Sequence, residues 1–255
     1  MKIKLCQGGL LVILSLSAAV SLSAARPSAS DFDAANQACA VQKYDEAIRL
    51  YEHLLQNGSL SASVYYNLGN AYYLHGEVGK AVLGYQRALL LEPNAADVAA
   101  NLAALRQAQG LPEPAVAWWQ RPLLVFGRDT WAWLGGAALL LAMLAVFLRG
   151  AWLNFGDAEK CPHRWFHGAV TVSGLALALS IGGALAQGER ADRQVVMTND
   201  APLKVSPFAD AGDLASLREG ELVKPLKRHN DFVFVKNTAG QKGWVAREKL
   251  APVVL

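Results

Sequence analysis

The sequence predicts a multi-domain chain in three parts: an all-α solenoid of helical hairpins, a two-helix transmembrane hairpin and a small all-β barrel. Three observations predict this fold class. Up to residue 110, apolar residues recur at helical spacing, and the pattern repeats after about 34 residues. Residues 130–148 and 168–187 are long runs without a charged side chain. From residue 191 onward, short β-prone segments alternate with turn residues.

Residues 1–25 have the features of a secretory signal peptide. Lys2 and Lys4 are followed by an apolar stretch and by the small residues Ser-Ala-Ala before Arg26. An uncleaved anchor would show the same charge asymmetry. Under either interpretation, residue 26 onward is exported across the membrane.

The two uncharged runs, residues 130–148 and 168–187, match the roughly 20 residues that a helix needs to cross a bilayer. Two tryptophans at the start of the first run are typical of a membrane interface. Buried core helices are the alternative. With the first domain exported, residues 111–129 form a linker and residues 149–167 a cytoplasmic loop.

The predicted loop carries three potential metal ligands, Cys161, His163 and His167. A structural zinc site needs four ligands. We therefore interpret this segment as a basic and aromatic anchor at the membrane surface, and the sequence predicts no metal site and no cofactor.

The helical region, residues 28–110, contains small and aromatic residues in a fixed order. The signature positions of a tetratricopeptide repeat are matched by Leu68, Gly69, Tyr72, Ala81, Tyr85, Ala88 and Pro93, and Ala47 and Tyr51 precede two of them by one repeat length. The small residues let helices approach closely, the tyrosines fill the space between hairpins, and the proline follows the second helix. We expect about two and a half repeats, with residues 97–109 as a final capping helix.

In a fold of this kind, the first helix of each hairpin lines a concave groove. The groove positions that the packing signature does not dictate are Phe32, Asn36, Tyr66, Asn70 and Tyr73. The asparagines would bind a peptide backbone through both donor and acceptor, and the aromatic rings would give apolar contact. The alternative is that these residues cover a solvent face or contact the next helix. Because no basic residue occupies these positions, we expect a neutral extended segment or a helix rather than a clamped carboxylate.

Residues 191–255 resemble a bacterial SH3-like domain. The segment 195–207 resembles its opening strand and loop, and the segment 231–250 resembles its final hairpin, with a Gly-Trp-Val near the end. Gly243 and Trp244 are expected in the barrel core, with ligand stacking as the alternative role of the tryptophan. Eleven Lys and Arg against eight Asp and Glu in residues 190–255 are too small an excess to indicate nucleic-acid binding.

The full order of features resembles the BatE family of the bacterial aerotolerance operons. The resemblance rests mainly on YYNLGNAYY at residues 65–73 and on the Gly-Lys-Ala that follows it. It implies an adaptor in the bacterial inner membrane, with both soluble domains in the periplasm. The implied partners are the von Willebrand A-domain Bat proteins and a MoxR-type ATPase.

Two other functions are considered beside the adaptor. One is a cell-wall sensor or wall-enzyme activator, in which the SH3-like domain binds peptidoglycan peptides. The other is an enzyme, but the exported parts offer no recognisable nucleophile, acid–base pair, metal set or phosphate loop. The Cys/His pair of wall-cutting proteins with such a domain is also lacking, since His229 is the only histidine after residue 190 and no cysteine follows Cys161. We therefore expect a non-enzymatic protein.

Overall fold

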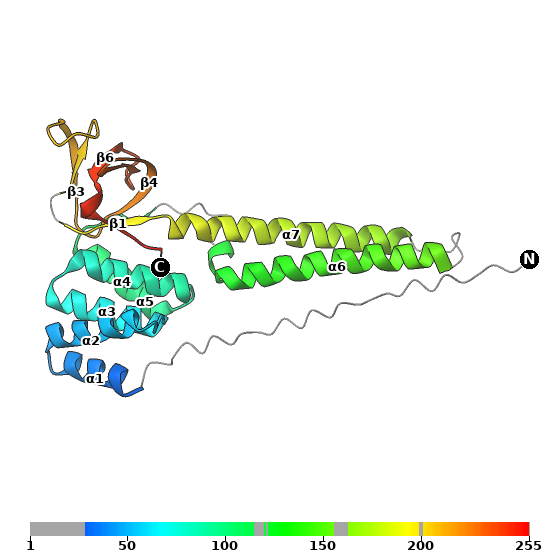
Figure 1. Cartoon of the computed structure of the whole chain (residues 1–255), viewed down its shortest axis with the longest axis horizontal. Helices are drawn as coiled ribbons and strands as arrows, with labels where there is room; N and C mark the ends of the chain where they lie inside the picture. The colour runs from blue at the N-terminus through cyan, green and yellow to red at the C-terminus, as the bar shows by residue number, and fades with distance from the viewer. Residues whose placement is uncertain (1–28, 115–119, 121, 156–162, 199–200, 255) are drawn as a thin grey trace, which may run out of the picture.

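The computed structural model describes residues 29–114, 120, 122–155, 163–198 and 201–254. Five short helices are followed by two long apolar helices and an all-antiparallel sheet, which confirms the predicted fold class. The short helices and the sheet lie together at one end of the molecule, and the long helices project from them side by side (Figure 1). The predicted signal peptide and Cys161 lie outside the described residues.

The first part, called the repeat array here, consists of two helical hairpins and a fifth helix: α1 (Ala29–Ala40), α2 (Tyr44–Gln56), α3 (Ala62–His75), α4 (Val78–Leu91) and α5 (Ala96–Ala108). Local sequence sets these ends. The Ser61 hydroxyl accepts a hydrogen bond from the Val64 amide and so caps α3. Gly76, at φ 94°, ends α3 in the left-handed conformation that glycine adopts most readily. Pro93 follows the end of α4 by two residues.

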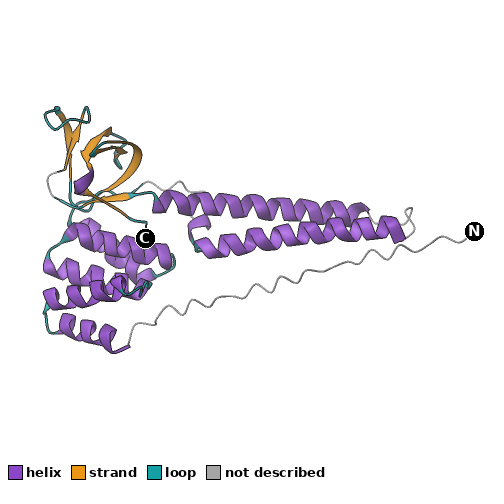
Figure 2. Ribbon diagram, in the orientation of Figure 1, coloured by secondary structure: helices purple, strands orange, loops and turns teal. Residues whose placement is uncertain are grey.

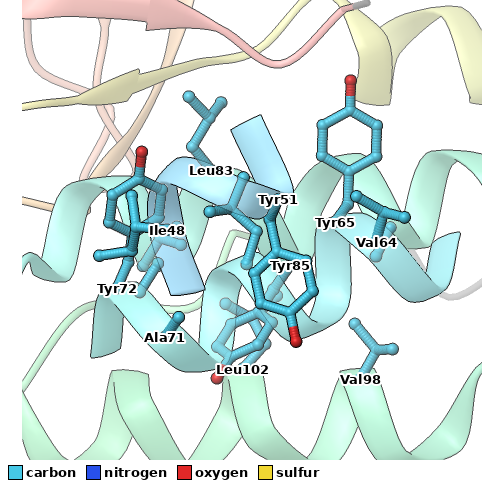
Figure 3. Packing of buried hydrophobic residues seen from close by; sticks show 14 of the residues in the cluster. Ile48, Tyr51, Val64, Tyr65, Ala71, Tyr72, Leu83, Tyr85, Val98 and Leu102 are labelled. Atoms are coloured by element: carbon cyan, nitrogen blue, oxygen red, sulfur yellow. The ribbon is translucent and has the colours of Figure 1, made fainter. Parts of the chain in front are cut away.

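Tyrosines, aliphatic side chains and alanines form the core of the array (Figure 3). The helices α3 and α4 approach most closely where Gly69 faces Gly84. A Cβ on Gly69 would lie 2.9 Å from the ring of Tyr85, and a Cβ on Gly84 would lie 2.9 Å from the Cα of Gly69. A side chain at either position would push the hairpin apart. Gly84 is therefore as necessary for this contact as Gly69.

The long helices are α6 (Arg128–Phe155), which follows the short 3-10 turn η1 (Pro122–Leu124), and α7 (His163–Ala191). Within them, Asp129–Ala151 and Trp165–Ala191 are long and apolar enough to cross a membrane. Both helices are longer than the uncharged runs, so the loop expected over residues 149–167 is correspondingly shorter. The reason is that residues 149–155 and 163–167 contain no proline, and helical hydrogen bonding continues past the charged edges.

The two long helices run side by side (Figure 2). Small residues lie at their contact. The Ser180 hydroxyl donates a hydrogen bond of 2.6 Å to the Trp131 carbonyl oxygen. A Cβ on Gly183 would lie 2.1 Å from the indole of Trp131, and one on Gly135 would lie 2.6 Å from the Ser180 Oγ. Such contacts between small residues are typical of helix pairs in membranes.

The last part, called the β domain here, is a seven-stranded antiparallel sheet in the order β3-β2-β6-β5-β4-β1-β7. Its strands are β1 (Gln194–Val196), β2 (Ala201–Lys204), β3 (Asp213–Leu217), β4 (Leu222–His229), β5 (Phe232–Lys236), β6 (Lys242–Ala246) and β7 (Leu250–Pro252), with a 3-10 turn, η3 (Arg247–Lys249), before the last. Their inward side chains form a small aliphatic core of their own.

Gly243 and Trp244 lie on opposite faces of this sheet. A Cβ on Gly243 would lie 2.6 Å from the Cγ of Leu203, so the position is closely packed. Trp244 is half-buried and contacts the rings of Phe234 and His229, at centroid distances of 5.1 and 6.1 Å. The expectation of a core tryptophan does not match this placement, because alternation along β6 turns Gly243 inward and the next residue outward.

The β domain is docked on α4 of the repeat array. Three of its buried residues, Val195, Leu222 and Val253, belong to the same apolar cluster as the array core. The β domain contacts α4, the second helix of the α3–α4 hairpin. The helices α1, α3 and α5 therefore keep a face that the β domain does not cover. Docking thus leaves the expected groove uncovered.

Polar contacts and a glycine fix the position of the β domain. The Gly79 amide donates to the Glu219 carboxylate at 2.7 Å, and the Arg218 guanidinium donates to the Gly110 carbonyl at 2.8 Å. Gly220 of the β domain, at φ 80°, lies so close to the array that a Cβ on it would be 2.9 Å from the Leu111 side chain. The array and the β domain therefore form one body.

Candidate functional site

The open face of the repeat array is clearest on α3. Its buried residues occupy one side of the helix, and the opposite side carries six residues that are exposed or half-buried: Ser63, Tyr66, Asn67, Asn70, Tyr73 and Leu74. A shift of one repeat length places the equivalent positions on α1 and α5. Three of the five predicted groove residues lie on this face of α3, and Phe32 and Asn36 lie on α1.

Asparagine and tyrosine side chains connect the helices beneath this face in a pattern that recurs from one repeat unit to the next. In the first unit, the Tyr51 hydroxyl and the Asn67 amide both donate to Asn36 Oδ1, at 2.6 and 2.8 Å. In the second unit, the equivalent Tyr85 and Asn101 donate to Asn70 Oδ1, at 2.6 and 3.2 Å. We call this repeated set the asparagine ladder.

The ladder changes the role expected for Asn36 and Asn70. Each was expected to offer a peptide both a donor and an acceptor, but both acceptors bind groups within the array. The hydrogen bonds seen in the described part of the chain leave their Nδ2 groups as donors. The expected alternative, contact with the next helix, is what the structure shows for both asparagines.

The two groove aromatics closest to the ladder are also held by the array. Phe32 packs edge-on against Tyr51 with ring centroids 6.1 Å apart, and Tyr66 lies 6.0 Å from Tyr85. The Asn101 amide donates to the Tyr66 hydroxyl at 2.9 Å. These rings are half-buried and held in place by the array itself.

Tyr73 and Leu74 project more freely at the end of α3. Tyr73 is 41% exposed and Leu74 is 52% exposed. Sequence reasoning identified Tyr73 but missed Leu74, which is four residues after Asn70 and so lies on the same helix face. Together they supply the apolar surface that a bound segment would cover.

The third unit widens the face, because small residues replace the large ones. On α5 the positions equivalent to Tyr66, Asn70 and Leu74 are Ala100, Ala104 and Ala108. Sequence reasoning also missed Asn67 and Asn101 as members of the ladder. The signal was present, since these two asparagines are themselves separated by one repeat length.

Burial keeps the ladder neutral. It raises the pKa of Tyr51 to about 12, with a smaller contribution from nearby Cys39 in the same direction, and the hydrogen bond from Asn67 acts against it. Burial likewise raises the pKa of Tyr85. The hydroxyls therefore remain donors at neutral pH.

The remaining predicted repeat residues lie in the core rather than on the open face. The buried ones are Ala47, Tyr51, Leu68, Gly69, Tyr72, Ala81, Tyr85 and Ala88, and Pro93 is half-buried after α4. The Tyr72 hydroxyl donates to the Glu52 carboxylate, which ties α3 to the preceding hairpin. These residues shape the face from beneath.

Comparison with known proteins identifies one unit of the array. A family model for the tetratricopeptide repeat matches residues 62–95, which span α3, α4 and the turn after Pro93. No curated protein matches the chain. The chain therefore contains a tetratricopeptide repeat, a module of protein–protein interaction that is typically not catalytic.

Proposed function

We propose that this protein is a non-enzymatic adaptor, anchored in a membrane by α6 and α7, that binds a segment of a partner protein on the open face of its repeat array. The observation that carries the proposal is the asparagine ladder in a matched tetratricopeptide unit. The ladder fixes the donors and rings of the face in advance, which lowers the entropic cost of binding.

The chemistry of the face favours a neutral ligand. Asn36 and Asn70 offer amide donors to the carbonyl groups of a peptide, and Tyr73 and Leu74 offer apolar contact. The two long apolar helices would hold this face near a membrane surface. By the resemblance to the BatE family, we place both soluble parts in the periplasm of a bacterial inner membrane, with von Willebrand A-domain Bat proteins as partners in a stress-tolerance complex.

The test is partner capture from intact cells by crosslinking, with variants that spare the ladder. Replacing both Asn70 and Tyr66 would remove ladder contacts as well as groove contacts, so Tyr73→Ala with Leu74→Ala is the better change. We expect the double variant to accumulate normally in the membrane and to lose most of the captured partner. Tyr44→Ala, on the second helix of the first hairpin, is the matched control. Equal capture by the double variant and wild type would reject the groove assignment.

A second candidate function rests on the outward aromatic group of the β domain. Trp244 contacts the rings of both Phe234 and His229 on the face opposite the aliphatic core. Aromatic faces with a polar neighbour are suited to stacking on a flat ligand, so this group favours binding of peptidoglycan stem peptides by an SH3-like domain.

Binding of the full chain to purified cell wall tests this second function. Retention that is lost in Trp244→Ala and kept in Tyr73→Ala with Leu74→Ala would establish wall binding. Retention that is unchanged by Trp244→Ala would reject it.

A further inference from the structure

Three arginines from separate elements meet where the repeat array, the long helices and the β domain join. Arg106 comes from the last turn of α5, Arg190 from the end of α7, and Arg193 from the segment before β1. They line a hollow of about 210 Å³ together with Glu113 and an apolar wall that includes Leu102. We call this hollow the arginine pocket.

The described residues balance the positive charge of the pocket only in part. Among them, Glu113 is the only carboxylate that lines it. The nearby Glu189 accepts hydrogen bonds from Lys224 and Gln120, each at 3.1 Å, and so is already bound. The segment 115–121, which follows the pocket residues, contains no acidic residue in the sequence.

Two guanidinium nitrogens in the pocket are buried without a hydrogen-bond partner among the described residues. They are Nη2 of Arg106 and Nη1 of Arg190. Leaving a buried charged donor unsatisfied is costly, and a bound ion is one of the explanations for such a group in a folded protein. The unpaired nitrogens belong to α5 and α7, which are far apart in the sequence, so the pocket is assembled only in the folded chain.

The arginines also destabilise one another's charge. Burial lowers the pKa of Arg106 to about 10, Arg193 and Arg190 add to this effect, and Glu113 opposes it. Burial lowers the pKa of Arg193 in the same direction, against the influence of Glu189. At neutral pH the guanidiniums remain charged, so an anion entering the pocket would relieve the repulsion.

We propose that the arginine pocket binds a phosphate group. Guanidinium groups bind phosphate through paired, charge-assisted hydrogen bonds, and a phosphate offers enough oxygen acceptors for several of them. The hollow has several times the ~30 Å³ that one water occupies, which gives room for such a group. Neither the groove of the array nor its partner is needed for this site.

The position of the pocket indicates where the phosphate would come from. Arg190 and Arg193 stand at and just past the end of the apolar span Trp165–Ala191. In a membrane-anchored chain, this is the level of the lipid headgroups, where basic residues attract anionic lipids. A phospholipid headgroup is thus the favoured source, and free phosphate is the other.

The experiment uses the full chain in lipid-free detergent micelles, with thermal unfolding followed by tryptophan fluorescence. Two probes are added separately: inorganic phosphate, with chloride at matched ionic strength as its reference, and phosphatidylglycerol, with phosphatidylcholine as its reference. We expect a saturable rise in Tm of about 2–4 °C with at least one probe. A rise with phosphatidylglycerol alone identifies a lipid headgroup, and a rise with inorganic phosphate identifies free phosphate. The lipid result alone depends on the proposed membrane anchoring.

Variants decide whether the rise comes from the arginine pocket. Arg106→Gln should not lower Tm without a probe, because it removes a buried like charge, and it should abolish the rise. Arg228→Gln, an exposed arginine on β4, is the matched control and should keep it. Should Arg106→Gln unfold the protein, Arg193→Gln and equilibrium dialysis with radiolabelled phosphate give the same comparison. No rise with either probe, or an equal rise in Arg106→Gln and wild type, would overturn the proposal and leave the groove function untouched.

Discussion

The asparagine ladder predicts that two substitutions at one hydrogen bond have different costs. Tyr85→Phe removes the hydroxyl that donates to Asn70 Oδ1, and this oxygen keeps the amide of Asn101 as a donor. One hydrogen bond is lost and no buried group is left unpaired, so the expected cost is about 1 kcal/mol. Asn70→Ala instead removes the acceptor. Tyr85 is only 2% exposed, so its hydroxyl would be buried without an acceptor. The lost bond and this penalty together cost about 3 kcal/mol.

Hydrogen–deuterium exchange on the full chain in micelles measures this difference. For peptides that cover α3, Tyr85→Phe should raise the exchange rate about 5-fold and Asn70→Ala about 150-fold, since each 1.4 kcal/mol is a factor of about ten. Tyr51→Phe makes the same change in the first unit and is the internal control. It should raise the exchange rate in the first hairpin about as much as Tyr85→Phe raises it in the second. Equal effects of Tyr85→Phe and Asn70→Ala would show that the ladder does not hold the array together.

Three further outcomes follow from the packing and the charges. Between pH 10 and 12 the unfolded chain releases the proton of Tyr51 while the folded state keeps it, because its folded pKa is about 12. Urea unfolding should therefore show that this residue lowers the free energy of unfolding by up to about 1.4 kcal/mol per pH unit in this range. Tyr51→Phe should reduce that slope. Gly220→Ala places a side chain at φ 80° and against Leu111, which should lower the free energy of unfolding by about 1–2 kcal/mol. It should also speed deuterium exchange at the Gly79 amide, which the β domain protects. Unchanged exchange at this amide would contradict the docking. Gly183→Val should separate α6 from α7 and lower the yield of crosslinks between cysteines introduced into them, and the smaller side chain of Trp131→Ala should restore the yield.

Features encoded by local spacing could be predicted from the sequence. The repeat pattern predicted the hairpins of the array, and two uncharged runs predicted the long helices, because each pattern reflects contacts along one helix or between neighbours. The same reasoning could have found the ladder, since Asn67 and Asn101 recur at the repeat period. It could also have placed Trp244 on the outer face. Trp244 pairs with Phe234 of β5, whose neighbours Val233 and Val235 point into the core, so Phe234 and Trp244 share the opposite face.

Contacts between distant segments left no such pattern. Gly79 and Glu219 are 140 residues apart, and nothing in the sequence near either predicts that they meet. The arginine pocket is equally hidden, because Arg106 and Arg190 are each unremarkable in their own helix. Such juxtapositions depend on how whole elements pack, which periodicity does not encode.

Docking of the β domain on α4 also has a consequence for the order in which we expect the chain to fold. The contacts between Arg218 and Gly110 and between Arg87 and Pro252 close loops of 108 and 165 residues. Contacts within the array join neighbouring helices, whereas closing one of these long loops costs about 4 kcal/mol of chain entropy before the docking contacts form. Packing of Ser180 on Trp131 shortens the loop by bringing together residues 49 apart. We therefore expect docking to be the last step of folding, and we expect a chain whose long helices fail to pair to keep the apolar side of α4 exposed to proteases.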